Sequence, residues 1–528
     1  MKKNDKEKVK IRTFSTQNYH WADGIAEKLI KQGSKSTHFI CAAGIAPSGT
    51  IHIGHFREVI TVDLVVRVLK KRNKKARFIF FWDDFDRFRK IPKNVPKHGV
   101  LENFLFFPLS LIPDPYSCHS NYAEHFEKEF ENSLRITGIN PEIISQYKNY
   151  TSCKYAKEIR FVLESKKKIK DILNRYRKEP LPTEWWPVQI YCETCKKDTT
   201  KILEWDGNFV LKYECSCGNK GCVDFSKKGI VKLPWRIDWP MRWHYAKIDF
   251  EPGGKEHSTP GGSIDTARDI IIEVYKEKPP LYMTYDFIIV KGMGGKMSSS
   301  TGNVITLQKC LEIYEPQIIR YLFASTRPNT EFSISFDQDV IKIYADYDLL
   351  EERYFTNQLD NKHRRIFELS QIDTSKPVKV FAPSFRQLVE LVQLKTENEI
   401  LEFFEEKIKN EADKKRTLHR IKLAKNWLKY APEHFKFKIQ KNVKKEIKER
   451  LSKEEVTALK KFSELGKELD SEDSIMEKIK EICVEYEIKP KNFFEAAYLI
   501  ILGKKNGPRL STLLLLEKEK ILKLLRDL

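Results

Sequence analysis

The sequence lacks an uninterrupted apolar run of about 18 residues, the length that a membrane-spanning helix requires. Its opening stretch, MKKNDKEKVKIRTF, is charged and has no apolar core of the kind found in a secretory signal. Internal repeats and low-complexity tracts are also missing. These absences predict a cytoplasmic protein with no membrane partner, in a compartment where thiols stay reduced. The 10 cysteines are therefore expected to be metal ligands or buried apolar residues rather than disulfides.

Acidic residues are outnumbered by basic ones. The chain of 528 residues, long enough for two or three domains, has 95 Lys and Arg against 74 Asp and Glu, a formal charge of +21. Such an excess favours a polyanionic partner such as RNA. A solvated surface in a lysine-rich chain explains it nearly as well, so charge alone decides little.

The hydrophobic pattern predicts an α/β domain followed by helices. Residues 38–43 and 76–82 read as buried strands on either side of a glycine loop and a helix from about 54 to 71. This order is typical of a doubly wound, Rossmann-like parallel sheet. Further helices are expected at 154–178 and 265–278, and a strand at 285–292. From about Leu307 onward the chain is helix-patterned, with Lys/Glu pairs at i,i+4 spacing and no strand-rich block.

The stretch GIAPSGTIHIGH, residues 44–55, has the composition of a phosphate-binding loop. Its glycines let the backbone approach a ligand closely, and it runs into a helix N-terminus that favours anions. His52 and His55 share one face of the first helical turn. Two imidazoles there can stabilise charge on an ATP phosphate, although surface histidines at a helix start would look the same. The expected ATP contacts are Pro47, Ser48, Gly49, His52, Gly54 and His55.

A second loop, GMGGKMSSSTGN, follows the strand expected at 285–292. Lys296 is a cation between glycines, and three serine hydroxyls come after it. Such a loop can close over a triphosphate and neutralise the leaving pyrophosphate. A flexible surface turn is the alternative. The expected ATP contacts here are Lys296, Met297, Ser298, Ser299 and Ser300, and His52, His55 and Lys296 are the expected catalytic residues.

Taken together, the two loops resemble the HIGH and KMSKS signatures of class I aminoacyl-tRNA synthetases. Ser299 replaces the second lysine of the latter. Wider stretches, including WDDFDRFRKIP and RIDWPMRWHYAKIDFEPGGKEH, resemble the class I lysyl-tRNA synthetases of archaea and some bacteria. The resemblance is dense over most of residues 18–340. It implies ATP-dependent loading of L-lysine onto tRNA(Lys), with Mg²⁺ accompanying ATP. A monomer is expected.

The same resemblance implies a lysine pocket between the two loops. Gly44 is expected to contribute a backbone contact, and Trp239, His257 and Tyr285 to line the aliphatic stem. The ammonium needs an acidic partner, since a desolvated cation left unpaired is costly. Asp83 is the candidate chosen, with Asp84, Asp238 and Asp286 left open. Each of these residues has a structural alternative, as a core aromatic or a helix cap.

Five cysteines fall between Cys192 and Cys222, with the spacing of a zinc ribbon. Paired thiolates on two tight turns can place four sulfurs around zinc. The five candidates are Cys192, Cys195, Cys215, Cys217 and Cys222, of which Cys217 or Cys222 is the spare. A set of small buried residues is the alternative.

The stretch DPYSCHSNYAEH contains a second cluster of potential metal ligands. Asp114, Cys118, His119 and His125 match the ligand types of a metal-binding segment in the family that the chain resembles. A polar loop with an incidental Cys-His pair is the alternative. Both sites, each with four protein ligands, would hold structural Zn²⁺.

These observations predict an order of domains along the chain. A segment 1–37 precedes the two halves of the catalytic domain, 38–190 with a zinc loop at 112–126 and 229–315. A zinc-ribbon insertion, 191–228, separates the halves, and a helical stem and anticodon-binding domain, 316–528, completes the chain. The rival hypotheses are a glutamyl- or arginyl-tRNA synthetase, a nucleotidyltransferase such as a cytidylyltransferase, which also uses an HxGH loop, and a synthetase-derived RNA-binding protein without activity.

Overall fold

The structure is a computed structural model that describes residues 20–33, 38–291 and 304–528. Contacts between residues divide it into two units. The first comprises the described residues up to Ile334 together with Leu350–Pro377, and the second comprises Ser335–Leu349 and Val378–Leu528. The helix-patterned region expected from residue 316 thus contributes 316–334 and 350–377 to the first unit.

A five-stranded parallel sheet forms the centre of the first unit. Its strands lie in the order β10 (Leu281–Tyr285), β9 (Phe250–Gly254), β1 (His38–Ile45), β2 (Lys75–Trp82) and β3 (Glu142–Ser145). Every neighbouring pair is parallel. The order changes direction between β1 and β9, so a crevice is expected at the carboxyl ends of these two strands. The predicted doubly wound parallel sheet is confirmed.

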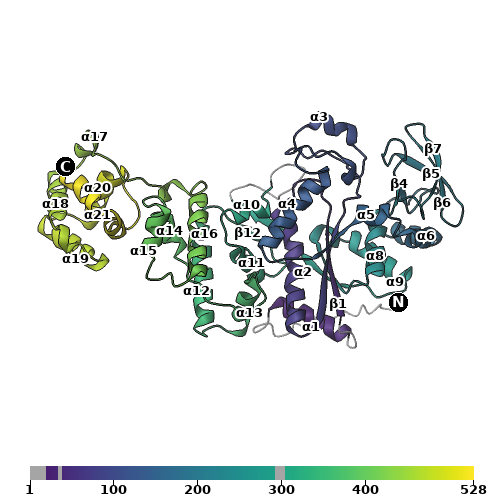
Figure 1. Cartoon of the computed structure of the whole chain (residues 1–528), viewed down its shortest axis with the longest axis horizontal. Coiled ribbons are helices and arrows are strands. Elements are labelled where there is room, and N and C mark those ends of the chain that lie inside the picture. The colour runs from purple at the N-terminus through teal and green to yellow at the C-terminus, as the bar shows by residue number, and fades with distance from the viewer. Residues whose placement is uncertain (1–19, 34–37, 292–303) are drawn as a thin grey trace, which may run out of the picture. The chain divides into compact units, whose positions relative to one another are not determined.

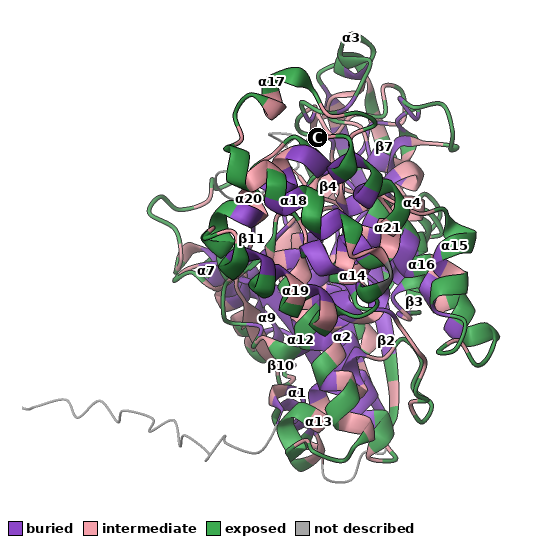
Figure 2. Ribbon diagram, turned by 90° about the vertical axis from the view of Figure 1, so that its left-hand side faces the viewer, coloured by how far each residue is buried: buried purple, intermediate pink, exposed green. Residues whose placement is uncertain are grey.

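Helices cover both faces of this sheet (Figure 1). On one side of β1 lie α1 (Trp21–Gln32) and α2 (Ile53–Lys71), and on the other lie α8 (Trp235–Ala246) and α9 (Ser263–Glu273). Because both faces are covered, the central strands read as continuous apolar runs, and residues 78–82 of β2 are all buried. Figure 2 shows buried residues along α2 and β2.

Two elements differ from the sequence prediction. The basic stretch 154–178 forms two helices, α6 (Ala156–Glu164) and α7 (Lys166–Asn174), which are separated at Ser165. The strand expected at 285–292 does not join the parallel sheet. The chain turns after Tyr285, and β11 (Ile288–Val290) pairs with β12 (Phe332–Ile334) in a separate two-stranded sheet.

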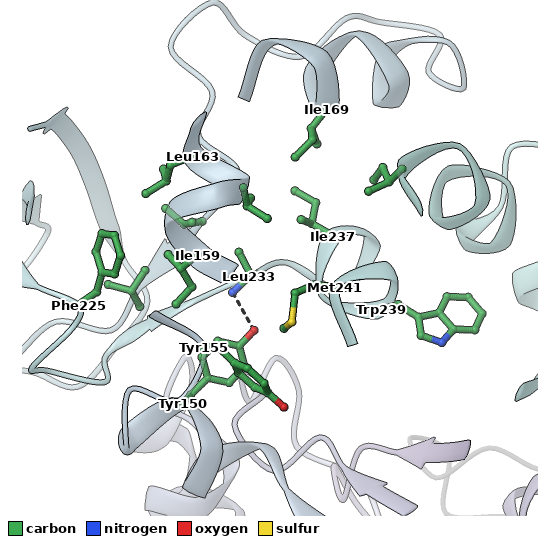
Figure 3. Packing of buried hydrophobic residues seen from close by; sticks show 14 of the residues in the cluster. Tyr150, Tyr155, Ile159, Leu163, Ile169, Phe225, Leu233, Ile237, Trp239 and Met241 are labelled. Carbon is green, nitrogen blue, oxygen red and sulfur yellow. Dashed lines mark hydrogen bonds between the residues drawn. The ribbon is translucent and has the colours of Figure 1, made fainter. Parts of the chain in front are cut away.

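A large apolar cluster packs α6–α9 against the sheet and against the small strands that follow α7 (Figure 3). Ile159, Ile237 and Met241 point into it, and Trp239, also on α8, lies to one side. The hydroxyl of Tyr150 accepts a 3.3 Å hydrogen bond from the backbone N–H of Leu233. The cluster therefore fixes α8, the helix that carries Trp239, against the rest of the unit.

Three buried arginines of the first unit donate hydrogen bonds to backbone carbonyls of the same unit. Arg57 donates to the carbonyls of residues 286, 287, 327 and 330 at 2.6–3.0 Å. Arg67 donates to those of residues 138, 371 and 372, and Arg320 to those of residues 137 and 369. Arg67 and Arg320 also share the carboxylate of Asp63. Each guanidinium satisfies carbonyls that no helix or sheet pairs.

The remaining elements of the first unit include an insertion with its own small sheet. This sheet is formed by β5 (Thr200–Trp205), β6 (Val210–Cys215) and β7 (Lys220–Asp224), and β4 (Gln189–Ile190) pairs with β8 (Val231–Lys232) beside it. Short helices are α3 (His98–Leu101), α5 (Gln146–Thr151) and α10 (Leu307–Leu311), and longer ones are α4 (Tyr122–Ile136), α11 (Pro316–Ser325) and α13 (Asn361–Ser370).

The second unit is helical, which confirms the predicted all-α C-terminal domain. Helix α12 (Asp339–Phe355) begins in it, and its other helices are α14 (Phe385–Leu391), α15 (Glu397–Phe403), α16 (Glu411–Trp427), α17 (Lys445–Lys448), α18 (Lys453–Glu464), α19 (Glu472–Glu485), α20 (Pro490–Leu502) and α21 (Leu510–Arg526). The last four share an apolar core. Among the described residues of both units, no helix is long and apolar enough to cross a membrane.

Candidate active site

The loop after β1 and the start of α2 hold both motif histidines at the carboxyl end of the sheet. His52 is the N-cap of α2, and its Nδ1 accepts a hydrogen bond from the backbone N–H of Gly54 at 3.1 Å. The Nδ1 of His55 accepts one from the backbone N–H of His52 at 3.2 Å. The ring centroids lie 3.9 Å apart. The sequence therefore brings the pair together through reciprocal capping of one helix.

This capping sets the protonation of both rings. A neutral imidazole whose Nδ1 accepts a hydrogen bond must have its proton on Nε2. Burial lowers the pKa of His55 to about 4, so this ring is neutral at pH 7. Both histidines are thus held as Nε2–H donors, the form that binds a phosphate oxygen.

Gly54 has a steric reason to be glycine. Its φ lies outside the left-handed region, but a Cβ built there would lie 2.7 Å from Cε1 and Nδ1 of His52. The glycine therefore leaves space for the ring of His52. Elsewhere in the loop, Pro47 and Gly49 are buried, Ser48 is exposed, and the carbonyl of Ser48 accepts a 3.0 Å hydrogen bond from Tyr122.

Lys296, Met297, Ser298, Ser299 and Ser300 lie outside the described residues. The described segments on either side of their loop both contact the start of α2. Ile53 donates its backbone N–H to the carbonyl of Ile305 at 2.8 Å, and His52 and Thr306 form an isolated β-bridge. On the other side, Arg57 binds the carbonyls of Asp286 and Phe287. The described residues that flank the second motif in the sequence therefore lie beside the start of α2.

Arg57 is a residue that the sequence reasoning did not single out. Burial lowers its pKa to about 10, which leaves it charged at pH 7, and its guanidinium lies 5.0 Å from the ring centroid of Phe332. It is two residues after His55, so one helix turn carries both a phosphate-binding candidate and the anchor of the neighbouring loop. Its position within the motif helix was the available signal.

The aspartates considered as partners for an ammonium group all have other partners in the structure. Asp83 forms a 2.6 Å ion pair with Arg242, which also binds Asp238. Asp84 accepts a 2.7 Å hydrogen bond from the backbone N–H of Tyr147. Asp286 pairs with Lys255 at 3.0 Å.

Two glutamates that the sequence reasoning missed occupy the centre of the site. Glu58 accepts hydrogen bonds from the backbone N–H of Gly44 at 2.8 Å and from the hydroxyl of Tyr285 at 2.7 Å. Glu251, on β9, accepts one from Nε1 of Trp243 at 2.5 Å. Glu58 follows His55 by three residues, on the same helix face, and Glu251 is an acid within a buried strand. Both patterns were visible in the sequence.

The surroundings of these two glutamates raise the pKa of both carboxyl groups. Burial raises the pKa of Glu58 to about 8, and Tyr285 and Gly44 oppose that rise as hydrogen-bond donors. Burial raises the pKa of Glu251 to about 7. The charges of Glu251 and Asp83 also raise the pKa of Glu58, and the charge of Asp83 raises the pKa of Glu251. No ion pair to either glutamate occurs within the ranges that the structure describes. The site therefore contains carboxyl groups whose ionised forms a bound cation would stabilise.

Aromatic side chains lie next to this acidic cluster. Trp239 is 3% exposed, and its ring lies 5.0 Å from that of Trp243 and 5.7 Å from that of His257. Burial lowers the pKa of His257. Tyr285 reaches the cluster through Glu58. The structure thus places Gly44, Asp83, Trp239, Tyr285 and His257 around one region at the ends of β1, β9 and β10.

Four of the five clustered cysteines converge in the insertion. The sulfurs of Cys192, Cys195, Cys215 and Cys217 all lie within 4.8 Å of one another. The Cys192–Cys217 and Cys195–Cys215 separations are 3.7 and 3.6 Å. Tetrahedral zinc with Zn–S bonds of about 2.3 Å requires sulfurs about 3.8 Å apart, so the donor set fits. Cys222 is exposed on β7 and outside this group.

The two cysteine turns have the same design. Lys196 and Gly218 follow the second cysteine of each pair, and both have left-handed backbone, with φ of 62° and 90°. Each donates its N–H to the carbonyl of the first cysteine at 2.9 Å. The glycine in the second turn suits this conformation.

The second metal-ligand cluster also assembles. Cys118 Sγ lies 3.1 Å from Nδ1 of His119 and 3.2 Å from Nδ1 of His125, and Asp114 lies 3.7 Å from His125. Asp114 already accepts three backbone N–H bonds, from Tyr116, Cys118 and His119, at 2.8–2.9 Å. These bonds explain its position without a metal, so it is the least supported of the four ligands.

Comparisons with known proteins agree with this geometry. Residues 19–373 match the family model described as tRNA synthetases class I (K), and residues 420–528 match an anticodon binding domain. Similar curated proteins named Lysine--tRNA ligase come from Borreliella burgdorferi, at 43% identity over 93% of this chain and 96% of that one, and Pyrococcus horikoshii, at 38% over 96% and 99%. A solved glutamate tRNA ligase from Elizabethkingia meningosepticum aligns with a TM-score of 0.44 and 12% identity, covering 93% of this chain and 98% of that chain. The chain therefore belongs to the family of class I tRNA synthetases (K).

Proposed function

We propose that the chain is a lysine–tRNA ligase, which activates L-lysine with ATP and transfers it to the 3′ end of tRNA(Lys). The observation that carries the choice of amino acid is a pair of glutamates: Glu58, half-buried on α2 and bound to the backbone of Gly44 in β1, and Glu251, buried on β9. Glu58 and Glu251 have no ion-pair partner among the described residues and so suit an ammonium group. A glutamate substrate would instead need cations there, which argues against a glutamyl-tRNA synthetase.

In the proposed first step, the carboxylate of lysine attacks the α-phosphate of ATP and pyrophosphate leaves. His52 and His55 donate from Nε2 to phosphate oxygens, and Lys296 neutralises the pyrophosphate. In the second step, the 3′-terminal ribose of tRNA attacks the adenylate and AMP leaves. The protein orients the reactants and offsets charge, so no covalent enzyme intermediate is required. Mg²⁺ enters with ATP.

The residues around the acidic cluster supply the proposed lysine contacts. Gly44 and Tyr285 hold Glu58 in place, while Trp239 and His257 line the aliphatic stem. Asp83 is assigned a supporting role because Arg242 already neutralises it. For metals, we propose Zn²⁺ at Cys192, Cys195, Cys215 and Cys217, and a second Zn²⁺ at Asp114, Cys118, His119 and His125, each holding its loop together.

ATP–pyrophosphate exchange with each of the twenty amino acids, with and without tRNA, tests this function. Lysine alone should support exchange. Exchange with glutamate or arginine would assign the chain to one of the rival specificities. Tight tRNA binding with no exchange for any amino acid would support the inactive RNA-binding alternative.

A further inference from the structure

The first of the two cysteine turns is attached at both ends to residues 83–87, which we call the post-β2 segment. Tyr191 directly precedes the turn, and its hydroxyl donates a hydrogen bond to the carbonyl of Phe85 at 2.8 Å. Asp198 lies beyond the other end of the turn and accepts a hydrogen bond from Arg87 at 3.2 Å. The turn is therefore held between two contacts with the same short segment.

A third contact comes from β8, the strand at which the chain leaves the insertion. Lys232, on this strand, forms an ion pair with Asp86. Three consecutive residues of the post-β2 segment thus each have one partner in or beside the insertion. We call Tyr191, Asp198 and Lys232 the tethers.

The tethers are buried. The side chain of Asp198 is 3% exposed, and Tyr191 and Lys232 are also buried. A buried carboxylate or carbonyl that loses its partner is left unsatisfied, so each tether resists displacement of the segment. The three contacts therefore fix the geometry of the segment against the insertion.

The post-β2 segment begins beside the proposed amino-acid pocket. Asp83 donates its backbone N–H to the carbonyl of Ile45, at the end of β1, at 2.9 Å. The backbone N–H of Asp86 closes a turn onto the carbonyl of Asp83 at 3.2 Å. Asp83 lies close enough to Glu58 and Glu251 for its charge to raise the pKa of both. A displacement at the tethered end would therefore reach the acidic cluster.

The cysteine turn determines where two of the tethers lie. The backbone N–H of Cys192 donates to the carbonyl of Lys197 at 2.9 Å, so the turn closes directly before Asp198. The four sulfurs of the two turns lie within 4.8 Å of one another. Zinc bound by these sulfurs would fix the turn, and with it the positions of Tyr191 and Asp198.

We infer that Tyr191, Asp198 and Lys232 are positioning residues, through which metal bound at the cysteine turns fixes the post-β2 segment and the amino-acid pocket beside it. This inference rests on the proposed function and adds that metal and lysine stabilise one arrangement of the segment. Two ligands that favour the same arrangement raise each other's affinity by the same factor. We call this factor the coupling.

The test measures the zinc affinity of the full-length, zinc-loaded chain by titration with a chromogenic chelator, with and without saturating L-lysine. The zinc that the Cys195→Ser variant lacks is the zinc of the cysteine turns, which distinguishes it from a second site. In the wild-type chain, lysine should raise this zinc affinity about tenfold, and zinc should raise the affinity for lysine by the same factor.

The double variant Tyr191→Phe/Asp198→Asn removes two tethers and keeps all the cysteines. Its zinc content should equal that of the wild-type chain, but its coupling should fall below about twofold. Its KM for lysine should rise about tenfold while kcat stays within about twofold, because the segment is misplaced before lysine binds.

The matched control is Tyr213→Phe/Asp224→Asn, which makes the same two changes elsewhere in the insertion. Both of these side chains bond to residues of the insertion itself. The control should keep the wild-type coupling and the wild-type KM for lysine.

A further variant, Arg87→Gln, removes one tether from the side of the post-β2 segment and leaves the sequence of the insertion intact. It should keep the wild-type zinc content and lower the coupling at least about threefold. This variant decides the question if the double variant binds less zinc than the wild-type chain.

Equal zinc affinity with and without lysine in the wild-type chain would overturn the inference. A wild-type coupling in Arg87→Gln would overturn it too, because the metal would then act through other contacts.

Failure of the proposed function is a separate result, since it appears as absent lysine-dependent pyrophosphate exchange. Hydrogen exchange then decides the inference without an amino acid. The amide of Asp86 should exchange faster in Cys195→Ser than in Cys222→Ser, and equal rates would overturn the inference.

Discussion

Replacement of Glu58 by Gln should remove most of the affinity for lysine while leaving the fold intact. The glutamine keeps the shape: its Oε1 can accept from the backbone N–H of Gly44, and its amide N–H can donate to the hydroxyl of Tyr285. It lacks the charge that offsets a desolvated ammonium. Breaking one side of a buried ion pair costs about 3 kcal/mol or more, which is about 150-fold in kcat/KM for lysine. KM for ATP should change little. Steady-state aminoacylation at varied lysine and ATP gives both values.

The pKa of Glu58 also predicts a pH dependence. Its folded-state pKa of about 8 means that the empty site holds a proton at pH 7, which lysine must displace. Affinity for lysine should therefore rise about tenfold between pH 7 and pH 9, and calorimetry in buffers of different ionisation enthalpy should detect released protons. The Gln variant should lose this dependence on pH.

The same shift has an opposite effect on the stability of the empty protein. Between the usual carboxyl pKa and about 8, the folded state binds more protons than the unfolded state, so this group makes stability fall as pH rises. Glu58→Gln should then melt at an equal or higher temperature than the wild-type chain at pH 8. Glu142→Gln, at an exposed strand position, is the control.

If Glu58→Gln kept kcat/KM for lysine within about threefold, the assignment of the ammonium partner would be refuted.

Three further predictions concern positioning and metal. Gly54→Ala should slow adenylate formation about 100-fold or more, because its Cβ would displace the ring of His52; normal pyrophosphate exchange would contradict this. Arg57→Lys should lower kcat at saturating lysine by about tenfold or more, since three donors cannot satisfy four carbonyls, and KM for lysine should change far less. The Cys195→Ser variant should bind one equivalent of zinc less per chain than the wild-type chain, as measured by mass spectrometry, whereas Cys222→Ser should keep the wild-type zinc content. Equal loss in both variants would reject the proposed ligand set.

The fold could be predicted where its causes are local. Residues 38–71 contain the sequence patterns of a buried strand, a glycine loop and an amphipathic helix. This order of elements predicts the parallel sheet. The strand expected at 285–292 forms in part, as β11 (Ile288–Val290), but its pairing outside the parallel sheet depends on distant groups. Arg57, more than 200 residues earlier, binds the carbonyls of residues 286 and 287, and β12 (Phe332–Ile334) supplies the strand that pairs with β11.

The site shows the same division. The histidines, the two loops and the cysteine turns come from short motifs, and the structure brings the described ones together. The acidic partners were sought among aspartates, but the role of Asp83 depends on Arg242 and that of Asp286 on Lys255, and no local pattern in the sequence pairs these residues. Cys222 sits opposite Lys212 in the β6–β7 register, and only that register shows that it faces away from the other four sulfurs.

The buried arginines Arg57, Arg67 and Arg320 have a consequence for how this chain can evolve. Lysine outnumbers arginine in its sequence. An ammonium has three donors and no flat fork, so it cannot reach the carbonyls that each guanidinium serves, and an orphaned buried carbonyl costs about 1–3 kcal/mol. Substitutions of arginine by lysine should therefore be tolerated on the surface but selected against at these three positions. There, the loss of one guanidinium would leave several buried carbonyls without a hydrogen-bond donor.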